Sequence, residues 1–508
     1  MKNIIQIAKK IGLTKKDLFL YGNYMSKINY DYENSTNKDG KLILVTSINP
    51  TPYGEGKTTL SIGLNDSLNL LGIKSVAALR EPSLGPVFGR KGGAIGGGKS
   101  IVIPSNEINL HFTGDFHAIT SANNLLCAIV DNHIYQGNKL NIDKVVIKRC
   151  LDVNDRSLRG NFVITPASEI MAIFCLSKNI EDLKRRIGNI IVGYTKENKE
   201  VYAKDLNAVD AVTLLLKDAI KPNLVQSKYG NPILIHGGPF ANIAHGCSSI
   251  IATKTALKLS DYVITEAGFG SDLGAIKFFD IKCKNNNIYP EAIILNVTIQ
   301  ALKHNGENNL SKGISNLEFH INNMKKYTSN LIVALNKFKE DKEEEIQFIK
   351  DFCTKLNIDF SICTNYLDGE IGCIELANKI INLKKNTKKY KVYNINDSLE
   401  EKINKMCKNE LGANIIEYTD LAKEKLKLYK NKKLDICISK TPMSLTQNPK
   451  ILGYPKDFKL KITDINLYNG ASFITIMLGN VITMPGLTKD SNYINMRIDN
   501  YGNISGIN

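Results

Sequence analysis

The stretch Leu42-Ile-Leu-Val45, followed by Thr51-Pro-Tyr-Gly-Glu-Gly-Lys-Thr-Thr59, decides the fold class of this 508-residue chain. The apolar run predicts a buried strand. After the glycines, leucines recur at helical spacing over residues 60–71 until Gly72 offers a stop. In the order strand, glycine loop and helix, a Gly-Lys-Thr sequence binds phosphate, because the loop and the helix N-terminus present N–H groups to the anion. The sequence therefore predicts a phosphate-binding loop in an α/β domain.

Each residue type in this loop has a chemical role. Lys57 is expected to bridge terminal phosphates, and the hydroxyl group of Thr58 is expected to bind Mg²⁺. The usual pattern begins with Gly, where this chain has Thr51 and then Pro52. The alternative is a chance Gly-x-Gly-Lys-Thr in a lysine-rich chain, but strand, loop and helix agree. The candidates for phosphate binding are Thr51, Pro52, Tyr53, Gly54, Glu55, Gly56, Lys57, Thr58 and Thr59.

Length and composition describe a large soluble protein. The length suggests about three domains, with approximate boundaries at 1–345, 346–433 and 434–508. The 43% hydrophobic and 23% charged residues are typical of a globular chain. No apolar stretch is long enough to span a bilayer, and residues 1–20 lack a signal-peptide core. We therefore expect a cytoplasmic protein without a membrane partner.

The formal net charge of +16 raises the question of nucleic-acid binding. Only eight of the 66 basic residues are Arg, the lysines are scattered, and no nucleic-acid signature accompanies them. We expect no nucleic-acid partner, and a basic background that attracts anionic substrates. The ten cysteines stand singly, which predicts reduced, mostly buried thiols with neither disulfides nor a structural metal.

Strand-like and helix-like patterns alternate over the first two-thirds of the chain. This alternation predicts a mainly parallel sheet covered by helices on both faces, followed by two smaller C-terminal α/β domains, the last of them strand-rich. Further helices are expected at 115–133, 247–260 and 371–383. The glycine-rich segment 85–100 is interpreted as a loop close to a ligand. The further expected strands lie at 75–81, 145–147, 232–236, 262–264, 293–295 and 331–334.

Several polar or aromatic residues follow predicted strand ends, where open α/β sheets bind ligands. We expect them to form one composite site; they are Lys57, Arg80, His236, Glu266 and Phe338. Two cations, Lys57 and Arg80, suit an anion in addition to the nucleotide phosphates, for example an acyl phosphate. The alternative for Arg80 is an ion pair with Glu81 or Asp115.

Asp115 could act as a general base, orient an amine or help to hold a cation. Its alternative role is to cap the helix that begins there, and both roles can coexist. His111 and His117 lack a neighbouring third ligand, so a metal site there is not expected. The aromatic residues Phe338 and Tyr366 could sandwich a flat heterocycle, although the pattern alone favours core packing.

Taken together, these segments resemble the formate–tetrahydrofolate ligase family over essentially the whole chain. The phosphate loop matches the family's variant, including its Thr-Pro start. The other similar segments are Arg80-Glu-Pro-Ser-Leu-Gly-Pro86, Lys91-Gly-Gly-Ala94, Gly96-Gly-Gly98, Asn109-Leu-His-Phe-Thr-Gly-Asp-Phe-His-Ala-Ile-Thr120, His236-Gly-Gly-Pro-Phe-Ala-Asn-Ile-Ala-His-Gly246, Thr265-Glu-Ala-Gly-Phe-Gly270, Phe278-Phe-Asp-Ile-Lys-Cys283 and Met484-Pro-Gly-Leu487.

The resemblance implies an enzyme of one-carbon metabolism that formylates tetrahydrofolate at N10 with Mg-ATP and formate, through formyl phosphate. Lys57 and Arg80 fall on the positions that stabilise phosphate and formyl phosphate, and Asp115 falls on the active-site aspartate. Phe338 and Tyr366 fall on the aromatic pair that holds the pterin. The resemblance also implies a homotetramer activated by a monovalent cation, K⁺ or NH₄⁺.

Some positions depart from the family pattern. Tyr366 stands where Trp is usual, and the chain has no Trp, so we expect weaker folate binding. The other departures affect peripheral contacts: Gln300 for Arg, Pro442 and Met443 for Gln and Tyr, and Asn466 and Ser472 for Arg and Gly. Two other functions remain open. One is a ligase that forms a different carboxyl phosphate or uses another acceptor, and the other is a non-enzymatic nucleotide-binding homologue.

Overall fold

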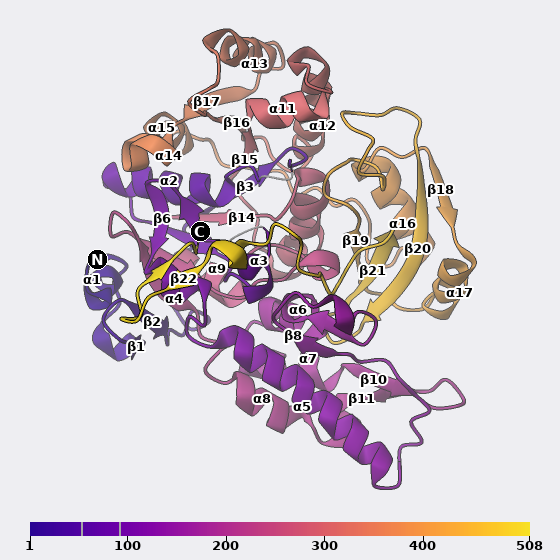
Figure 1. Cartoon of the computed structure of the whole chain (residues 1–508). Coiled ribbons are helices and arrows are strands. Elements are labelled where there is room, and N and C mark those ends of the chain that lie inside the picture. The colour runs from indigo at the N-terminus through magenta and orange to yellow at the C-terminus, as the bar shows by residue number, and fades with distance from the viewer. Residues whose placement is uncertain (52–53, 91–92, 508) are drawn as a thin grey trace.

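The computed structural model describes residues 1–51, 54–90 and 93–507. Its centre is a twelve-stranded sheet (Figure 1). Along the sheet the strands follow the order β1 (Leu18–Tyr21), β2 (Met25–Ile28), β12 (Asn223–Ser227), β13 (Pro232–Ile235), β4 (Ser75–Leu79), β14 (Tyr262–Glu266), β3 (Lys41–Ser47), β15 (Ala292–Val297), β16 (Leu331–Asn336) and β17 (Asp359–Cys363). The hairpin of β5 (Gly96–Gly97) and β6 (Ser100–Ile103) pairs with β12.

The pairs from β13 to β17 are all parallel, whereas β1, β2, β12 and β6 form an antiparallel margin. β3 lies in the middle, with Ile43 beside Ile264 of β14 and Ala292 of β15. The prediction of an α/β protein with a mainly parallel central sheet is confirmed. The carboxyl ends of β4, β14, β3, β15 and β16 meet along one edge.

Helices cover both faces of this sheet, which explains why its strands are continuous apolar runs. Successive side chains of a strand point to opposite faces. Ile43 and Val45 pack with α2 (Lys57–Leu70) and α15 (Ile374–Ile381). Leu42 and Leu44 belong to the cluster on the other face, with α9 (Ile250–Leu259), α12 (Leu310–Met324) and α13 (Glu343–Lys355).

Other helices connect or flank these layers. They are α1 (Ile4–Lys10), α3 (Leu84–Phe88), α4 (Ser105–Asn109), α10 (Lys284–Asn286), α11 (Ile299–Asn305) and α14 (Asn365–Asp368). Between β14 and β15 the chain forms two π-helical turns, Ser271–Ala275 and Phe278–Cys283. The sequence patterns did not predict these turns, because all their residues are buried and show no amphipathic period.

A separate lobe, at the bottom of Figure 1, has its own core. It contains α5 (Asp115–Tyr135), α6 (Glu169–Leu176), α7 (Ile180–Gly188), α8 (Val209–Leu216) and the sheet of β7 (Lys144–Val145), β10 (Ile191–Tyr194) and β11 (Glu200–Tyr202). Small parallel strands β8 (Arg149–Leu151) and β9 (Phe162–Ile164) follow β7 and precede α6. The strand expected at 145–147 is therefore not part of the central series. It is shortened to β7 and pairs antiparallel with β10.

The C-terminal part contains a four-stranded sheet in the order β18 (Ile415–Tyr418), β20 (Lys459–Tyr468), β21 (Phe473–Leu478) and β19 (Asp435–Ser439). Helices α16 (Leu399–Lys405) and α17 (Asp420–Leu428) accompany it (Figure 1). The sheets cross the approximate domain boundaries expected from the sequence. The central sheet includes β17, which lies past residue 345, and the C-terminal sheet includes β18, which lies before residue 434. The last strands, β22 (Arg497–Ile498) and β23 (Ile504–Ser505), lie beyond Asn492, whose side chain donates to the carbonyl of Val87 at 3.1 Å.

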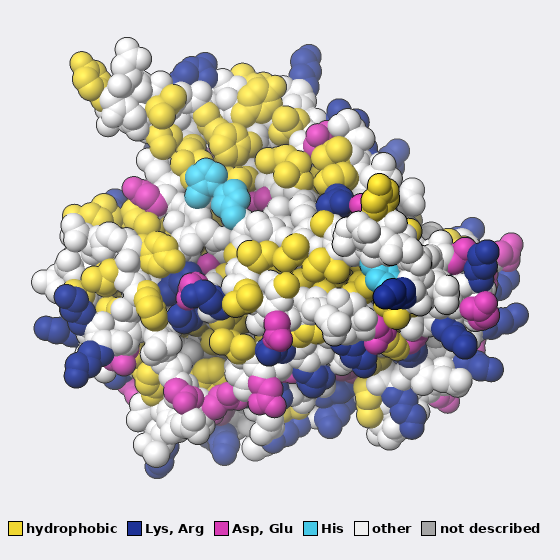
Figure 2. All heavy atoms as spheres, turned by 90° about the horizontal axis from the view of Figure 1, so that it is seen from below, with side chains coloured by type: hydrophobic (Ala, Val, Ile, Leu, Met, Phe, Trp, Pro, Cys, Tyr) yellow, Lys and Arg dark blue, Asp and Glu magenta, His cyan; other side chains and the backbone are white. Residues whose placement is uncertain are grey.

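The cysteine thiols and the charged surface residues can now be compared with the expectations from the sequence. All ten cysteines are buried free thiols. On the face shown in Figure 2, Lys and Arg side chains alternate with Asp and Glu and do not form one continuous basic band. Within the described ranges, no helix combines the length and apolar character needed to cross a membrane.

Candidate active site

The predicted phosphate loop connects the carboxyl end of β3 to α2. Gly54 and Gly56 have φ values of 88° and 71°, in the left-handed region that favours glycine. Gly56 is the N-cap of α2, and Lys57 is its first residue. Pro52 and Tyr53 lie outside the described residues. The strand, loop and helix expected from the sequence are present in that order.

Glu55 anchors this loop to the neighbouring strands. Its carboxylate accepts hydrogen bonds from the Thr51 N–H at 2.6 Å and the Thr298 hydroxyl at 2.6 Å. Its carbonyl accepts from the side chains of Asn296 at 2.6 Å and Asn336 at 3.4 Å. The Glu55 side chain is buried and turned into the protein. These contacts position the loop.

Lys57 lies at the start of α2, directly after the glycines of the loop. Its ammonium group donates to the hydroxyl of Ser47 at 3.0 Å. Burial lowers the pKa of Lys57 below its ordinary value; Glu266 and Glu55 oppose this change, and Arg80 adds to it. Arg80 is thus within electrostatic range of Lys57, although the two residues follow different strands.

Thr58 lies beside a buried carboxylate. Its hydroxyl is 3.1 Å from Oε1 and 3.0 Å from Oε2 of Glu266, the last residue of β14. A threonine hydroxyl and a carboxylate are oxygen ligands of the kind that Mg²⁺ prefers. The sequence placed Glu266 at a strand end, but its contact with Thr58 depends on the pairing of β14 with β3.

Arg80 and Glu81 follow β4 and line a pocket. Among the described residues, Arg80 makes no ion pair with Glu81 or Asp115, so the ion-pair alternative is wrong. The predicted ligand-proximal segment 85–100 contributes to the same pocket. Its walls are formed by Arg80, Glu81, Pro82, Ser83, Pro86, Gly93, Ala94, Pro166, Gly238 and Phe240.

Asp115 is buried and does not cap its helix. The N-cap of α5 is Gly114, and Asp115 is the first helical residue. Its carboxylate accepts from Lys27 Nζ at 2.6 Å and from Asn223 Nδ2 at 2.7 Å. The cap interpretation is therefore wrong, because these two distant residues bind the carboxylate. Lys27 and Asn223 carried no recognisable signal in the sequence.

His236 is buried in the protein and does not face a ligand. One ring nitrogen lies 2.6 Å from the hydroxyl of Ser249, and the other lies 2.8 Å from the carbonyl of Ala219. Burial lowers the pKa of His236 to about 4, so the ring is neutral at physiological pH. The residue supports the turn that leads to Gly238 and is not part of the pocket wall.

Phe338 and Tyr366 follow the neighbouring strands β16 and β17, whose ends pair through Asn336 and Cys363. Phe338 is half-buried, whereas Tyr366 is 49% exposed, so core packing is wrong for Tyr366. The ring of Tyr366 lies against the glycine-rich segment: a Cβ added to Gly97 would lie 3.2 Å from Tyr366 Cε2. The candidate heterocycle site therefore adjoins this segment.

Comparisons with known proteins identify the family of this chain. The family model described as formate–tetrahydrofolate ligase matches residues 1–508. The chain belongs to the formate–tetrahydrofolate ligase family. It is 51% identical to the formate–tetrahydrofolate ligase of Caldicellulosiruptor bescii, over 99% of this chain and 98% of the relative. It is 49% identical to the enzyme of that name from Campylobacter concisus, over 100% of this chain and 98% of the relative.

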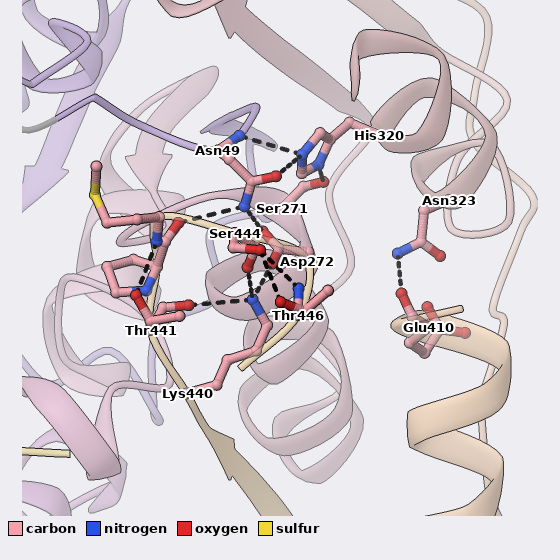
Figure 3. Close-up of polar contacts among 12 residues, drawn as sticks. Asn49, Ser271, Asp272, His320, Asn323, Glu410, Lys440, Thr441, Ser444 and Thr446 are labelled. Carbon is pink, nitrogen blue, oxygen red and sulfur yellow. Dashed lines mark hydrogen bonds and ion pairs between the residues drawn. The ribbon is translucent and has the colours of Figure 1, made fainter. Parts of the chain in front are cut away.

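In this family member a buried polar network supports the segment that precedes the phosphate loop (Figure 3). The N–H of Asn49 donates to His320 Nε2 at 3.2 Å, and the Asn49 side chain donates to Asp272 Oδ1 at 3.2 Å. Burial lowers the pKa of His320 to about 4. The neutral ring therefore carries its proton on Nδ1, which lies 2.7 Å from the hydroxyl of Ser271.

Lys440 connects this network to the C-terminal sheet. Its ammonium group lies 2.6 Å from Asp272 Oδ2, and both side chains are at most 1% exposed. It also donates to the carbonyls of Ser444 at 2.5 Å and Thr441 at 3.2 Å. Figure 3 shows these contacts converging on the ammonium group of Lys440. The segment after β19 is thus attached to the segment before the phosphate loop.

The structure shows the surroundings of several positions that the sequence analysis described as departures from the family pattern. The Asn49 side chain donates to the backbone carbonyl of Pro442 at 3.3 Å, a contact that does not depend on the side chain at 442. Ser472 has a φ of 65°, in the left-handed region that favours glycine. Asn466 accepts from Lys425 at 3.0 Å, and Gln300 is exposed on α11.

Proposed function

We propose that this chain joins formate to N10 of tetrahydrofolate with cleavage of ATP, giving 10-formyltetrahydrofolate, ADP and phosphate. Membership of the family over the whole chain carries this proposal. The site supports it, because Arg80 lines a pocket and lies within electrostatic range of Lys57. Mg-ATP as the nucleotide substrate follows from the ATP-dependent family.

The proposed reaction has two steps. A formate oxygen attacks the γ-phosphorus of ATP, and the bond to ADP breaks to give formyl phosphate. The N10 amine then attacks the formyl carbon, phosphate leaves with the oxygen from formate, and the amine loses its proton. Lys57 and Arg80 neutralise the charge that spreads over the phosphoryl oxygens, which is the main task in phosphoryl transfer. The predicted role of Asp115 in this account is to orient the amine or manage its proton.

The residues beside the phosphate loop fit a magnesium ion. Thr58 and Glu266 would hold it, with their three oxygens close together. The ion would neutralise phosphate charge. Phe338 and Tyr366 are proposed to hold the pterin. We also propose a cytoplasmic homotetramer activated by K⁺ or NH₄⁺, which the family resemblance supports.

Gly98→Ala should weaken folate binding. A Cβ at position 98 would lie 2.2 Å from the Tyr366 carbonyl oxygen and 2.8 Å from its ring, and the φ of Gly98 is +61°. The variant must move Tyr366, so we expect the KM for tetrahydrofolate to rise by about tenfold or more. Gly12→Ala is the matched control, because Gly12 has a φ of +82° with nothing within 4 Å of an added Cβ. Equal folate KM values for the two variants would contradict the placement of the pterin beside Tyr366.

Tyr366→Trp should have the opposite effect. A larger ring offers more stacking area to the pterin, and the half-exposed position leaves room for it. We expect a lower KM for tetrahydrofolate, measured at saturating ATP and formate. An unchanged or raised KM would argue against stacking at this position.

The function is tested by measuring ADP and 10-formyltetrahydrofolate with each substrate omitted in turn, in the presence of K⁺ or NH₄⁺. We expect both products to appear together, and only when ATP, formate and tetrahydrofolate are all present. Product formation with another carboxylic acid or acceptor would instead favour a ligase of different specificity. ATP binding without any turnover would favour a non-enzymatic homologue.

A further inference from the structure

A buried asparagine stands directly before Tyr366. Asn365 is the first residue of α14 and is 0% exposed, whereas Tyr366 is 49% exposed. The side-chain amide of Asn365 donates to the carbonyl of Thr59 at 2.8 Å and to the hydroxyl of Ser100 at 3.0 Å. Its Oδ1 accepts from the thiol of Cys373 at 3.3 Å. Both N–H groups and the oxygen of this amide are therefore paired, which fixes its orientation in the interior.

The two residues that accept from Asn365 belong to different segments of the candidate site. Thr59 lies in the first turn of α2, which follows the phosphate loop. Ser100 begins β6 of the glycine-rich hairpin, and its hydroxyl donates back to the carbonyl of Asn365 at 3.0 Å. In the same hairpin, the N–H of Lys99 donates to the carbonyl of Tyr366 at 2.8 Å. Asn365 thus joins the start of α2 and the hairpin to the backbone that carries Tyr366.

Two glycines allow this asparagine to come close to its neighbours. Gly63 lies one turn after Thr59 in α2, and a Cβ added there would lie 2.5 Å from Cγ of Asn365. A Cβ added to Gly372 would lie 2.5 Å from Cα of Asn365. Because glycine is less favourable than alanine inside a helix, Gly63 does not stabilise α2 itself. The close approach of Asn365 to the helix accounts for a glycine at this position.

We propose that Asn365 is a positioning residue of the proposed reaction: it holds Tyr366 at a fixed place relative to the phosphate loop. A folate whose pterin stacks on Tyr366 then presents N10 to the formyl group. This attack requires the two reacting atoms to approach within about 3–3.5 Å, and a misplacement of about 1 Å lowers the rate strongly. Asn365 itself contacts neither substrate in this account. The inference rests on the proposed function for the identity of the ligand, and on the contacts above for the attachment of Tyr366.

Asn365→Ala should lower kcat/KM for tetrahydrofolate by about tenfold or more, because it detaches Tyr366 from α2. The KM for ATP should change less than about twofold, since the backbone of α2 keeps its own helical hydrogen bonds. Kinetics with each substrate varied in turn separate these two effects.

Asn65→Ala is the matched control. Asn65 is another fully buried asparagine of α2, and its side chain donates to the carbonyl of Pro232 at 3.3 Å, away from Tyr366. We expect its kcat/KM for tetrahydrofolate to equal that of the wild-type protein. If Asn65→Ala lowered this value as much as Asn365→Ala does, the effect would be a general loss of stability and the inference would be wrong.

Two further variants act on the same contacts without removing the asparagine. Gly63→Ala suits the helix but displaces the Asn365 side chain, so we expect it also to lower kcat/KM for tetrahydrofolate. Its control is Gly188→Ala, because Gly188 ends α7 and an added Cβ there would come no closer than 3.4 Å to a neighbour. Ser100→Ala combined with Asn365→Ala should lose no more than Asn365→Ala alone. Additive losses would contradict a shared attachment of Tyr366.

Fluorescence tests the attachment of position 366 without turnover. The chain contains no Trp, so Tyr366→Trp places a single indole at the candidate site. The fluorescence anisotropy of this indole in the substrate-free protein reports side-chain and loop motion on the nanosecond timescale. In this background we expect Asn365→Ala to lower the anisotropy and Asn65→Ala to leave it unchanged. An anisotropy that Asn365→Ala does not lower would overturn the inference.

Binding of tetrahydrofolate separates the inference from the proposed function. Without ATP and formate, tetrahydrofolate should quench the indole emission of the Tyr366→Trp protein, and Asn365→Ala should raise the Kd from this titration by about tenfold or more. Equal Kd values with and without Asn365→Ala would overturn the positioning role. A protein in which Asn365→Ala lowers the anisotropy, but which forms no 10-formyl product, would overturn only the proposed function.

Discussion

Replacing Lys57 by alanine is expected to lower kcat/KM for ATP by about 10³-fold, or about 4 kcal/mol of transition-state stabilisation. The ammonium group is the cation at the start of α2, and the phosphoryl group spreads negative charge over its oxygens as it moves. The variant should fold, because the Lys57 ammonium makes one hydrogen bond, to Ser47, within the described part of the chain. Steady-state kinetics at saturating formate and tetrahydrofolate measure this effect.

Lys41→Ala is the matched control for this experiment. Lys41 begins the same strand at the opposite end, where its ammonium group contacts the Tyr262 hydroxyl at 3.2 Å. It is exposed and far along β3 from the phosphate loop, so we expect an unchanged kcat/KM. If Lys57→Ala were as active as Lys41→Ala, Lys57 would not bind the transferred phosphoryl group.

Replacing Lys440 by methionine is expected to lower the free energy of unfolding by about 3–5 kcal/mol. The change leaves the Asp272 carboxylate buried without its cation, and the pair is at most 1% exposed. The loss should also raise the KM for ATP, because Asp272 holds Asn49 just before the phosphate loop. Urea unfolding, with ATP kinetics on the folded variant, measures both consequences.

The control for the Lys440 experiment is an exposed ion pair on the C-terminal sheet, next to which Lys440 lies. Lys459 and Glu417 lie 3.2 Å apart, with side chains 61% and 48% exposed. Lys459→Met should cost less than about 1 kcal/mol, since water screens such pairs. Lys440→Met/Asp272→Leu should regain stability relative to Lys440→Met, because no buried charge remains. Equal unfolding curves for Lys440→Met and Lys459→Met would contradict the structural role of the buried pair.

The central sheet and the phosphate loop could be predicted because their signals are local. Buried parallel strands such as Lys41–Ser47 are short apolar runs, and the glycines and lysine that follow are adjacent in the chain. The positions of Arg80 and Glu266 could also be predicted, because Arg80 follows β4 and Glu266 ends β14, and the carboxyl ends of these strands share one edge. For these two residues the sequence predicted a position at the edge of the sheet, but it did not predict which residues they contact.

The contacts of Asp115 could not be predicted, because its partners are distant in the sequence. Lys27 lies 88 positions before Asp115, and Asn223 lies 108 positions after it. The antiparallel pairing of β2 with β12 places Lys27 beside Asn223, and no local pattern marks that pairing. Without these distant partners in view, the sequence showed only an acidic residue at the start of a helix, which is typical of a helix cap. The prediction of a central strand at 145–147 was wrong because the partner of β7 is β10, which lies almost fifty residues later and belongs to the lobe.

The most direct test of the proposed route uses formate labelled with ¹⁸O. If a formate oxygen attacks the γ-phosphorus and the amine then attacks the formyl carbon, one formate oxygen must leave with phosphate. We predict one ¹⁸O atom in each phosphate released, in equal amount to 10-formyltetrahydrofolate. Phosphate free of label, formed together with the 10-formyl product, would contradict activation of formate by phosphorylation, and the absence of that product would contradict the ligase function itself.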